Sequence, residues 1–382
     1  MSEKKNIRMM LAISFLQGMV FYASVATLYR QAAGITVWQM SVIESLSLAA
    51  TIGLEVPWGM VGDRIGYRKT MIISCMVFFV SKIVFWQAEG FAMFLLERLL
   101  LAVAVAGLSG VDESILYLSC SRDDFQRVMG RYAALGTAGL LTSSAVYTLL
   151  IRDYRQAALF TTVAYGLAAM LSLRLKEVKR LSPAQRRRPL ADFRECLRLL
   201  CHTRGLLPLI LSGALLGETI HQATIFLNQL QYVRCGWEEG MIGAAFTLTN
   251  VVELSGAFSA RCTRRWGERR MGLGLMLLSA LCCGILTVTR SGWLSLLCLL
   301  TLCACAALYG PLASEMTNRM IQTDNRATAL SVAALLSDGV MMATVLLLGR
   351  AAEIRLPLAL GLSCALCLAA ALLFARSSGP AA

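Results

Sequence analysis

Charged residues are scarce in this sequence, at 15% of its 382 residues, and it contains only two histidines. Soluble domains of ordinary composition carry about 25% charged residues. Here 57% of the residues are hydrophobic, and the mean hydropathy is +0.64. These values exclude a soluble globular protein and indicate an integral membrane protein.

Motifs for nucleotide binding and hydrolysis are missing as well. The sequence has no Walker A loop, no HExxH pair and no nucleophile elbow. Nearly all of the 13 cysteines fall within apolar runs. The Cys364 and Cys367 pair lacks companion ligands, so packing explains it better than a metal or redox site. We therefore expect no enzymatic activity, no cofactor and no metal, and ATP-driven transport is disfavoured.

Apolar runs long enough to cross a membrane recur along the whole chain. A span takes roughly 20 residues. The first run is too long for a secretory signal peptide and lacks its cleavage site, so we predict that it is retained as a span. The sequence predicts twelve spans, at residues 9–28, 38–61, 70–88, 92–118, 129–150, 156–174, 206–230, 239–260, 271–289, 293–316, 327–348 and 356–375.

Lysine and arginine are unevenly distributed between alternate loops. With the N-terminus inside, 27 of the 36 basic residues fall in cytoplasmic segments, seven, including Arg30, in outer loops, and two within spans. Because basic residues collect on the cytoplasmic side, both termini are expected to be cytoplasmic and the membrane to be the plasma (inner) membrane. Contact with anionic lipid explains the net charge of +13 without a nucleic acid.

A basic segment interrupts the apolar rhythm near the middle of the chain. Residues 176–205 are rich in arginine and contain two prolines. They are expected to link an N-terminal six-helix bundle, residues 1–175, to a C-terminal one, residues 206–382. Within this linker, residues 190–201 carry apolar side chains at helical spacing, which favours a helix lying on the inner leaflet over a solvated loop.

A cluster of glycines and charges lies between the second and third spans. Residues 59–69 read GMVGDRIGYRK, and the loop after the eighth span, ARCTRRWGERR, repeats part of this pattern with Arg264 in the place of Asp63. The first pattern resembles the signature loop of the major facilitator superfamily of secondary transporters. The resemblance extends to residues 54–57 (LEVP) and 325–328 (NRAT), and it covers nearly the whole chain.

This resemblance implies an all-α membrane protein with twelve transmembrane helices in two pseudo-symmetric six-helix bundles, working by alternating access. It also implies a gating latch, in which Asp63 faces the start of the eleventh helix. The alternative is that the arginines and lysine here are merely positive-inside charges. The residues of the expected gating motif are Gly59, Gly62, Asp63, Arg64, Gly66, Arg68 and Lys69, with Arg326 at the start of the eleventh helix.

Ionisable residues within spans are candidates for proton coupling, because a charge near the bilayer centre costs at least about 2.5 to 3.5 kcal/mol. Glu218 and Asp338 fall near mid-span, and Glu218 shares a helical face with His221 and Gln222. A purely structural role, in which Glu218 pairs with an internal arginine or amide, is the alternative. Further candidates are Asp112, Glu113 and Arg98.

Two basic residues within spans are interpreted differently. Arg98 matches the arginine of an Arg-x-x-Gln-Gly motif of proton-driven relatives, although Leu101 and Ala102 replace its Gln and Gly. The fifth span also lacks the Gly-Pro pair typical of drug antiporters. Lys82 falls close to the outer end of the third span, so we expect it to reach the membrane interface and to have no functional role.

The remaining polar residues within spans are expected to line a substrate cavity, although such residues also hold membrane helices together. The sequence predicts a monomeric secondary transporter, with proton-coupled export of an amphipathic or drug-like small molecule as the first choice. Uptake or facilitated diffusion of a small metabolite is one alternative, and a transport-incompetent receptor or scaffold is another. The cavity candidates are Gln17, Tyr22, Glu55, Gln222, Asn250 and Tyr309.

Overall fold

The computed structural model describes residues 2–120, 122–151, 153–178, 205–320 and 326–377. In this part of the chain every regular element is a helix. The chain divides into two compact units, one of residues 1–184 with 239–247 and one of residues 185–238 with 248–382. The bundle boundaries expected from the sequence stay a prediction. The helix expected at residues 190–201 lies outside the described residues.

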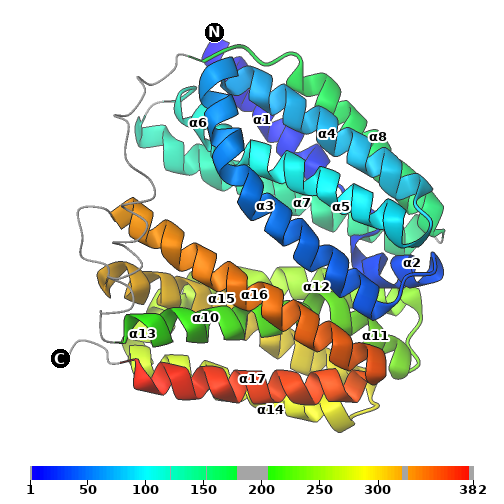
Figure 1. The fold of residues 1–382 in the computed structure, drawn as a ribbon, viewed down its shortest axis with the longest axis vertical. Coiled ribbons are helices and arrows are strands. Elements are labelled where there is room, and N and C mark those ends of the chain that lie inside the picture. Colours follow the sequence, from blue (N-terminus) through cyan, green and yellow to red (C-terminus); the bar gives the residue numbers. More distant parts are fainter. Residues whose placement is uncertain (1, 121, 152, 179–204, 321–325, 378–382) are drawn as a thin grey trace. The chain divides into compact units, whose positions relative to one another are not determined.

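Unit 1 contains most of the first half of the chain (Figure 1). Within it, α4 packs against α5 and α8, α3 packs against α5, and α1 packs against α7 and α8. Its elements are α1 (Ser2–Gly18), the 3-10 turn η1 (Ala23–Val25), α2 (Ala26–Ala32), α3 (Val37–Ile65), α4 (Tyr67–Gln87), α5 (Gly90–Leu108), α6 (Val111–Tyr117), α7 (Arg122–Leu150) and α8 (Tyr154–Ser172).

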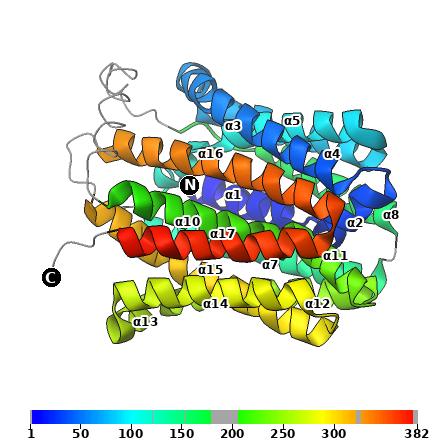
Figure 2. The same cartoon turned by 60° about the horizontal axis from the view of Figure 1, so that its bottom comes forward.

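Unit 2 is built in the same way from long, packed helices. The helices α14 and α17 run side by side in both views (Figures 1 and 2), and α10 packs against α15, α16 and α17. The elements are α10 (Leu206–His221), the π-helical segment η2 (Gln222–Phe226), α11 (Leu227–Arg234), the second part of α12 (Glu239–Glu253), the 3-10 turn η3 (Leu254–Phe258), α13 (Ser259–Trp266), α14 (Glu268–Val288), α15 (Gly292–Met320), α16 (Arg326–Ile354) and α17 (Leu356–Arg376). The first part of α12, residues 239–247, belongs to unit 1.

Each of the twelve predicted spans coincides with a helix or with consecutive helical segments, which confirms the fold class. Ten of the spans in the described residues are long and apolar enough to cross a membrane by length and composition. The helical surface is apolar too, with Leu149 and Leu150 each 78% exposed and Val288 77% exposed. Such large apolar side chains face lipid in a protein of this class.

The turn between α3 and α4 is shorter than the sequence suggests. We expected a loop between residues 61 and 70, but α3 continues to Ile65 and α4 begins at Tyr67, so a single residue, Gly66, makes the connection. Gly66 has φ 97° and ψ 151°, a conformation that is essentially limited to glycine. The glycine therefore allows two helices to meet with one residue between them.

An aromatic cluster fills the end of unit 1 remote from Gly66. Tyr22 stacks on Phe85 with ring centroids 4.0 Å apart, and Tyr29 and Phe94 meet Phe85 edge to face. All four side chains are buried. The cluster joins the end of α1 and the helix α2 to α4 and α5, and its rings contact two of the charged side chains described below, Lys82 and Arg30.

Candidate substrate cavity and charged network

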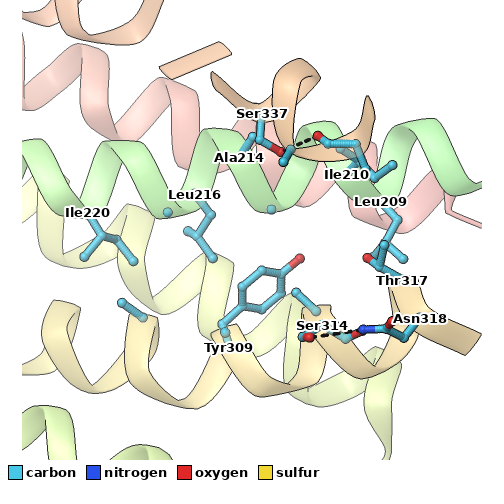
Figure 3. Close-up of a pocket in the computed structure, with 17 residues that line it drawn as sticks. Leu209, Ile210, Ala214, Leu216, Ile220, Tyr309, Ser314, Thr317, Asn318 and Ser337 are labelled. Atoms are coloured by element: carbon cyan, nitrogen blue, oxygen red, sulfur yellow. Dashed lines mark hydrogen bonds between the residues drawn. The ribbon is translucent and has the colours of Figure 1, made fainter. Parts of the chain in front are cut away.

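A cavity of about 300 Å³ lies between α10, α15 and α16, entirely within unit 2 (Figure 3). None of its lining side chains is charged. Most of the lining is apolar or small: Leu209, Ile210, Gly213, Ala214, Leu216, Gly217, Ile220, Ala306, Gly310, Ala313, Ala333 and Ala334. The polar lining residues are Tyr309, Ser314, Thr317, Asn318 and Ser337.

Tyr309 is the largest polar side chain of this cavity. It is buried, and its ring meets Phe374 edge to face. Its hydroxyl lies near the Ser212 side chain but makes no hydrogen bond of normal geometry in the described part of the chain. Figure 3 shows its ring projecting from α15 toward α10. A buried hydroxyl without a partner is unfavourable by roughly 1–3 kcal/mol. A ligand with a hydrogen-bonding group in this cavity would remove that penalty.

Two glycines keep the cavity open. A Cβ atom built on Gly217 of α10 or on Gly310 of α15 would meet no heavy atom within 4 Å, whereas one on Gly213 would lie 3.6 Å from the Tyr309 ring. The cavity has space beside Gly217 and Gly310 because these two residues have no side chain to fill it. On the α15 wall, Asn318 Nδ2 donates to the Ser314 backbone oxygen at 2.8 Å.

Glu218 and Gln222 form a buried pair at the end of α10. The Gln222 Nε2 donates to Glu218 Oε1 at 2.7 Å, and the two side chains are 4% and 5% exposed, respectively. His221 lies between them in sequence but is exposed, with its ring edge to face against Phe226. The π-helical segment begins at Gln222. Such segments occur frequently at functional sites.

Unit 1 contains a buried ion pair that the sequence analysis missed. Lys82 Nζ lies 3.1 Å from Glu97 Oε1 and donates at 3.1 Å to the Tyr22 hydroxyl. The ammonium also lies 5.8, 5.8 and 5.5 Å from the ring centroids of Tyr22, Phe85 and Tyr165. Lys82 is 5% and Glu97 1% exposed. The expectation that Lys82 reaches the interface was therefore wrong, because Glu97 provides a counter-charge within the bundle.

A second ion pair lies on the neighbouring helices. Arg98 Nη2 is 2.8 Å from Glu44 Oε2, and the two side chains are 19% and 29% exposed. Arg30, which we expected in an outer loop, lies instead in α2 and is only 7% exposed, with its guanidinium 5.8 Å from the Phe85 ring centroid. We refer to Arg30, Glu44, Lys82, Glu97 and Arg98 as the charged network.

The other predicted residues are scattered rather than gathered into one site. Asp112 accepts a hydrogen bond from the Tyr132 hydroxyl at 3.3 Å, and the Gln17 side chain lies 3.6 Å from the Cys75 sulfur. Three more of the residues occupy separate helices: Glu113 is exposed on α6, Glu55 is exposed on α3, and Asp338 is half-buried on α16. Asn250 is half-buried on α12.

Among the residues of the expected gating motif, Arg68 makes well-defined contacts within unit 1. Its side chain donates to the backbone oxygens of Leu173 and Leu175 at 3.1 and 2.5 Å, so it binds the end of α8. Arg64 and Lys69 are exposed. Gly59 and Gly62 lie within α3. The side chains of Asp63 and Arg326 are outside the part of the structure that is described, and the latch stays a prediction.

The sequence model of the Major Facilitator Superfamily matches residues 9–344. The chain belongs to this superfamily. Its fold is similar to the solved structure of the nucleoside transporter NupG, with a TM-score of 0.82 and 14% identity, over 97% of this chain and 99% of that one. It is also similar to the structure of a D-xylose-proton symporter, with a TM-score of 0.74 and 14% identity, over 97% of each chain. A third similar structure is that of a bacterial homolog of the human lysosomal transporter Spinster, with a TM-score of 0.72 and 15% identity, over 98% of this chain and 93% of that one. No curated protein sequence matches the chain.

Membership of the Major Facilitator Superfamily makes this protein a multi-pass membrane transporter of small molecules and not an enzyme. Within that class, the sequence contained one overlooked signal for the ion pair. Lys82 precedes the end of α4 by five residues, and Glu97 follows the start of α5 by seven. Since α4 and α5 are joined by a short connection, opposite charges at such positions come to similar depth in the bundle.

Proposed function

We propose that this superfamily member transports a small, uncharged molecule with one apolar face and a few hydrogen-bonding groups. The cavity between α10, α15 and α16 carries this proposal. Its lining residues are apolar or small, except for two serines, a threonine, an asparagine and a tyrosine. At about 300 Å³ it is at the small end of ligand pockets in proteins. A charged substrate would find no counter-ion among the lining residues.

Export coupled to protons is the direction that we propose first, as expected from the sequence. We also propose that the protein is a monomer in the plasma membrane, in contact with lipid, with both termini on the cytoplasmic side. Uptake is the second candidate. It is supported by the similarity to structures described as a nucleoside transporter and a D-xylose-proton symporter.

A steric variant tests whether the cavity holds the substrate. Gly217→Leu would place its side chain in the cavity without meeting protein atoms at Cβ. Gly274→Leu is the matched control, because Gly274 is an exposed residue of α14 outside the cavity and also has free space at Cβ. We would screen the purified protein for thermal stabilisation by uncharged nucleosides, sugars and amphipathic compounds, since a ligand that binds the folded state stabilises it.

Compounds found in that screen should stabilise the Gly274→Leu variant like the wild type and fail to stabilise Gly217→Leu. Equal stabilisation of both variants would remove the cavity from substrate binding. In liposomes, accumulation driven by an acidic lumen would indicate exchange for protons and hence export, whichever way the protein is inserted. Accumulation driven by an acidic outer solution would indicate symport and favour uptake.

A further inference from the structure

The charged network of unit 1 contains more positive than negative charge. Arg30, Lys82 and Arg98 contribute three positive charges, and Glu44 and Glu97 contribute two negative ones, which leaves an excess of one. The other polar groups that face Lys82 are the phenols of Tyr22 and Tyr165, and a phenol adds no formal charge. An uncompensated charge removed from water is strongly unfavourable.

Arg30 is the member of the network that has no counter-ion. Lys82 pairs with Glu97, and Arg98 pairs with Glu44. The Arg30 side chain is 7% exposed, and among the described residues it makes neither an ion pair nor a side-chain hydrogen bond. Its described partner is the face of the Phe85 ring, 5.8 Å away. A cation–π contact supplies no acceptor for the N–H donors of a guanidinium, and the Arg30 nitrogens are not fully sealed from the surroundings, so a further partner can reach them.

Arg98 and Glu97 are nearby charges, and they affect Arg30 in opposite ways. Arg98 repels it, whereas Glu97 and Glu44 attract it, although each of these carboxylates already has a closer basic partner. Glu97 Oε2 is a buried oxygen without a hydrogen-bonding partner, so Arg30 and this oxygen both lack partners although they belong to one network. A buried water could join donors to acceptors, but it would not remove the excess positive charge. An anion would do both for Arg30.

We propose that Arg30 is the primary residue of an anion site in unit 1, with Arg98 beside it. The ligand is a compact monoanion, either a halide or a carboxylate group, because a planar guanidinium binds both and the site has one positive charge to neutralise. The Arg98 and Glu44 side chains, at 19% and 29% exposure, are the most exposed members of the network. This site is separate from the uncharged cavity of unit 2.

Thermal unfolding of the full-length protein in detergent provides the test. Sodium chloride, sodium bromide, sodium formate and sodium acetate would each be compared with sodium methanesulfonate at the same ionic strength, so that general salt effects cancel. The variant is Arg30→Gln. Its control is Arg155→Gln, because Arg155 is an exposed arginine of the same unit, paired with exposed Glu89.

We expect halide or carboxylate to raise the unfolding temperature of the wild type and of Arg155→Gln, and not that of Arg30→Gln. Stabilisation by chloride and bromide identifies a halide site, and stabilisation by formate and acetate alone identifies a site for the carboxylate of an organic solute. The absence of any anion-specific stabilisation, or equal stabilisation of Arg30→Gln, would overturn the proposal.

A charge variant makes the same test if Arg30→Gln does not fold. Glu44→Gln removes one negative charge and releases Arg98, so anion affinity should increase by roughly tenfold. Glu89→Gln, which removes an exposed carboxylate of unit 1, should leave it unchanged. Unchanged affinity in Glu44→Gln would contradict the site. Because the measurement is binding in unit 1, its failure leaves the proposed transport function and the unit 2 cavity untouched.

Discussion

Arg68 and Arg269 make the same kind of contact in the two units. Each follows, by two residues, a glycine with positive φ, namely Gly66 at 97° and Gly267 at 78°. Arg68 donates to two backbone oxygens at the end of α8, and Arg269 donates to the Ala375 oxygen at the end of α17. The last carbonyls of a helix have no intrahelical donor. The repeated motif therefore fastens one helix end to another in each unit.

The glycine of this turn should be needed for its backbone conformation alone. Gly267 has φ 78° and ψ 148°, yet a Cβ there would meet nothing within 4 Å. We predict that Gly267→Ala lowers the free energy of unfolding by about 1–3 kcal/mol. Gly274→Ala, at an exposed helical position with equal space, should be neutral or stabilising by about 0.5–1 kcal/mol. Thermal or denaturant unfolding in detergent measures both, and equal effects would contradict the explanation.

Replacing only one residue of the Lys82 and Glu97 pair should destabilise the protein more than replacing both. Lys82→Met or Glu97→Met alone leaves a buried charge unpaired, and we predict a loss of about 3–5 kcal/mol in the free energy of unfolding. The double variant should be close to the wild type, because neither charge remains. A double-mutant cycle in detergent measures the coupling.

The exposed pair of Arg155 and Glu89 is the control for this cycle. Its side chains are 59% and 74% exposed, so the same substitutions there should each change stability by less than about 1 kcal/mol. If the two effects at Lys82 and Glu97 simply add, the pair does not act as a unit and its charges are stabilised by other groups.

The helices could be predicted closely from sequence, and the two sites could not. The run at residues 271–289 predicted α14, observed as Glu268–Val288, because about 20 apolar residues between charged turns leave few alternatives. Hydropathy registers the cost of a charge such as Lys82 but not the partner, Glu97, which another helix provides. The cavity could not be predicted for a related reason. The glycines and alanines that line much of it cannot be told in sequence from residues that allow helices to pack closely. Of the predicted cavity residues, Tyr309 alone lines it.

The Tyr309 hydroxyl should matter for binding and not for folding. Tyr309→Phe removes a buried hydroxyl without a described partner, so we predict unchanged or higher stability, by up to about 1 kcal/mol. Affinity for a cavity ligand should fall roughly fivefold, because a neutral hydrogen bond contributes about 1 kcal/mol. Tyr232→Phe is the control, since Tyr232 also carries a buried hydroxyl without a described partner but does not line the cavity. Ligand titration of both variants by thermal shift gives the comparison, and equal affinities would exclude the hydroxyl from binding.

Glu218 is the residue that we expect to couple transport to protons. It lies 12 residues beyond the start of α10, about 18 Å along the helix axis, and its carboxylate accepts a hydrogen bond from Gln222, the first residue of the π-helical segment. Burial disfavours a charged carboxylate, so such a group can take up a proton in one state and release it when water or a cation reaches it. Glu218→Gln mimics the protonated form.

We therefore predict that the Glu218→Gln variant binds substrate and exchanges it down a gradient but no longer accumulates it, with a milder defect of the same kind in His221→Ala. Reconstituted protein with an imposed pH gradient measures accumulation, and counterflow of labelled substrate measures exchange. Glu315→Gln is the control, because Glu315 is an exposed carboxylate of α15 and its removal should leave both rates unchanged. If Glu218→Gln still concentrates substrate at the normal rate, the coupling site lies elsewhere. Asp338 of α16, half-buried next to the cavity residue Ser337, is then the carboxylate to replace.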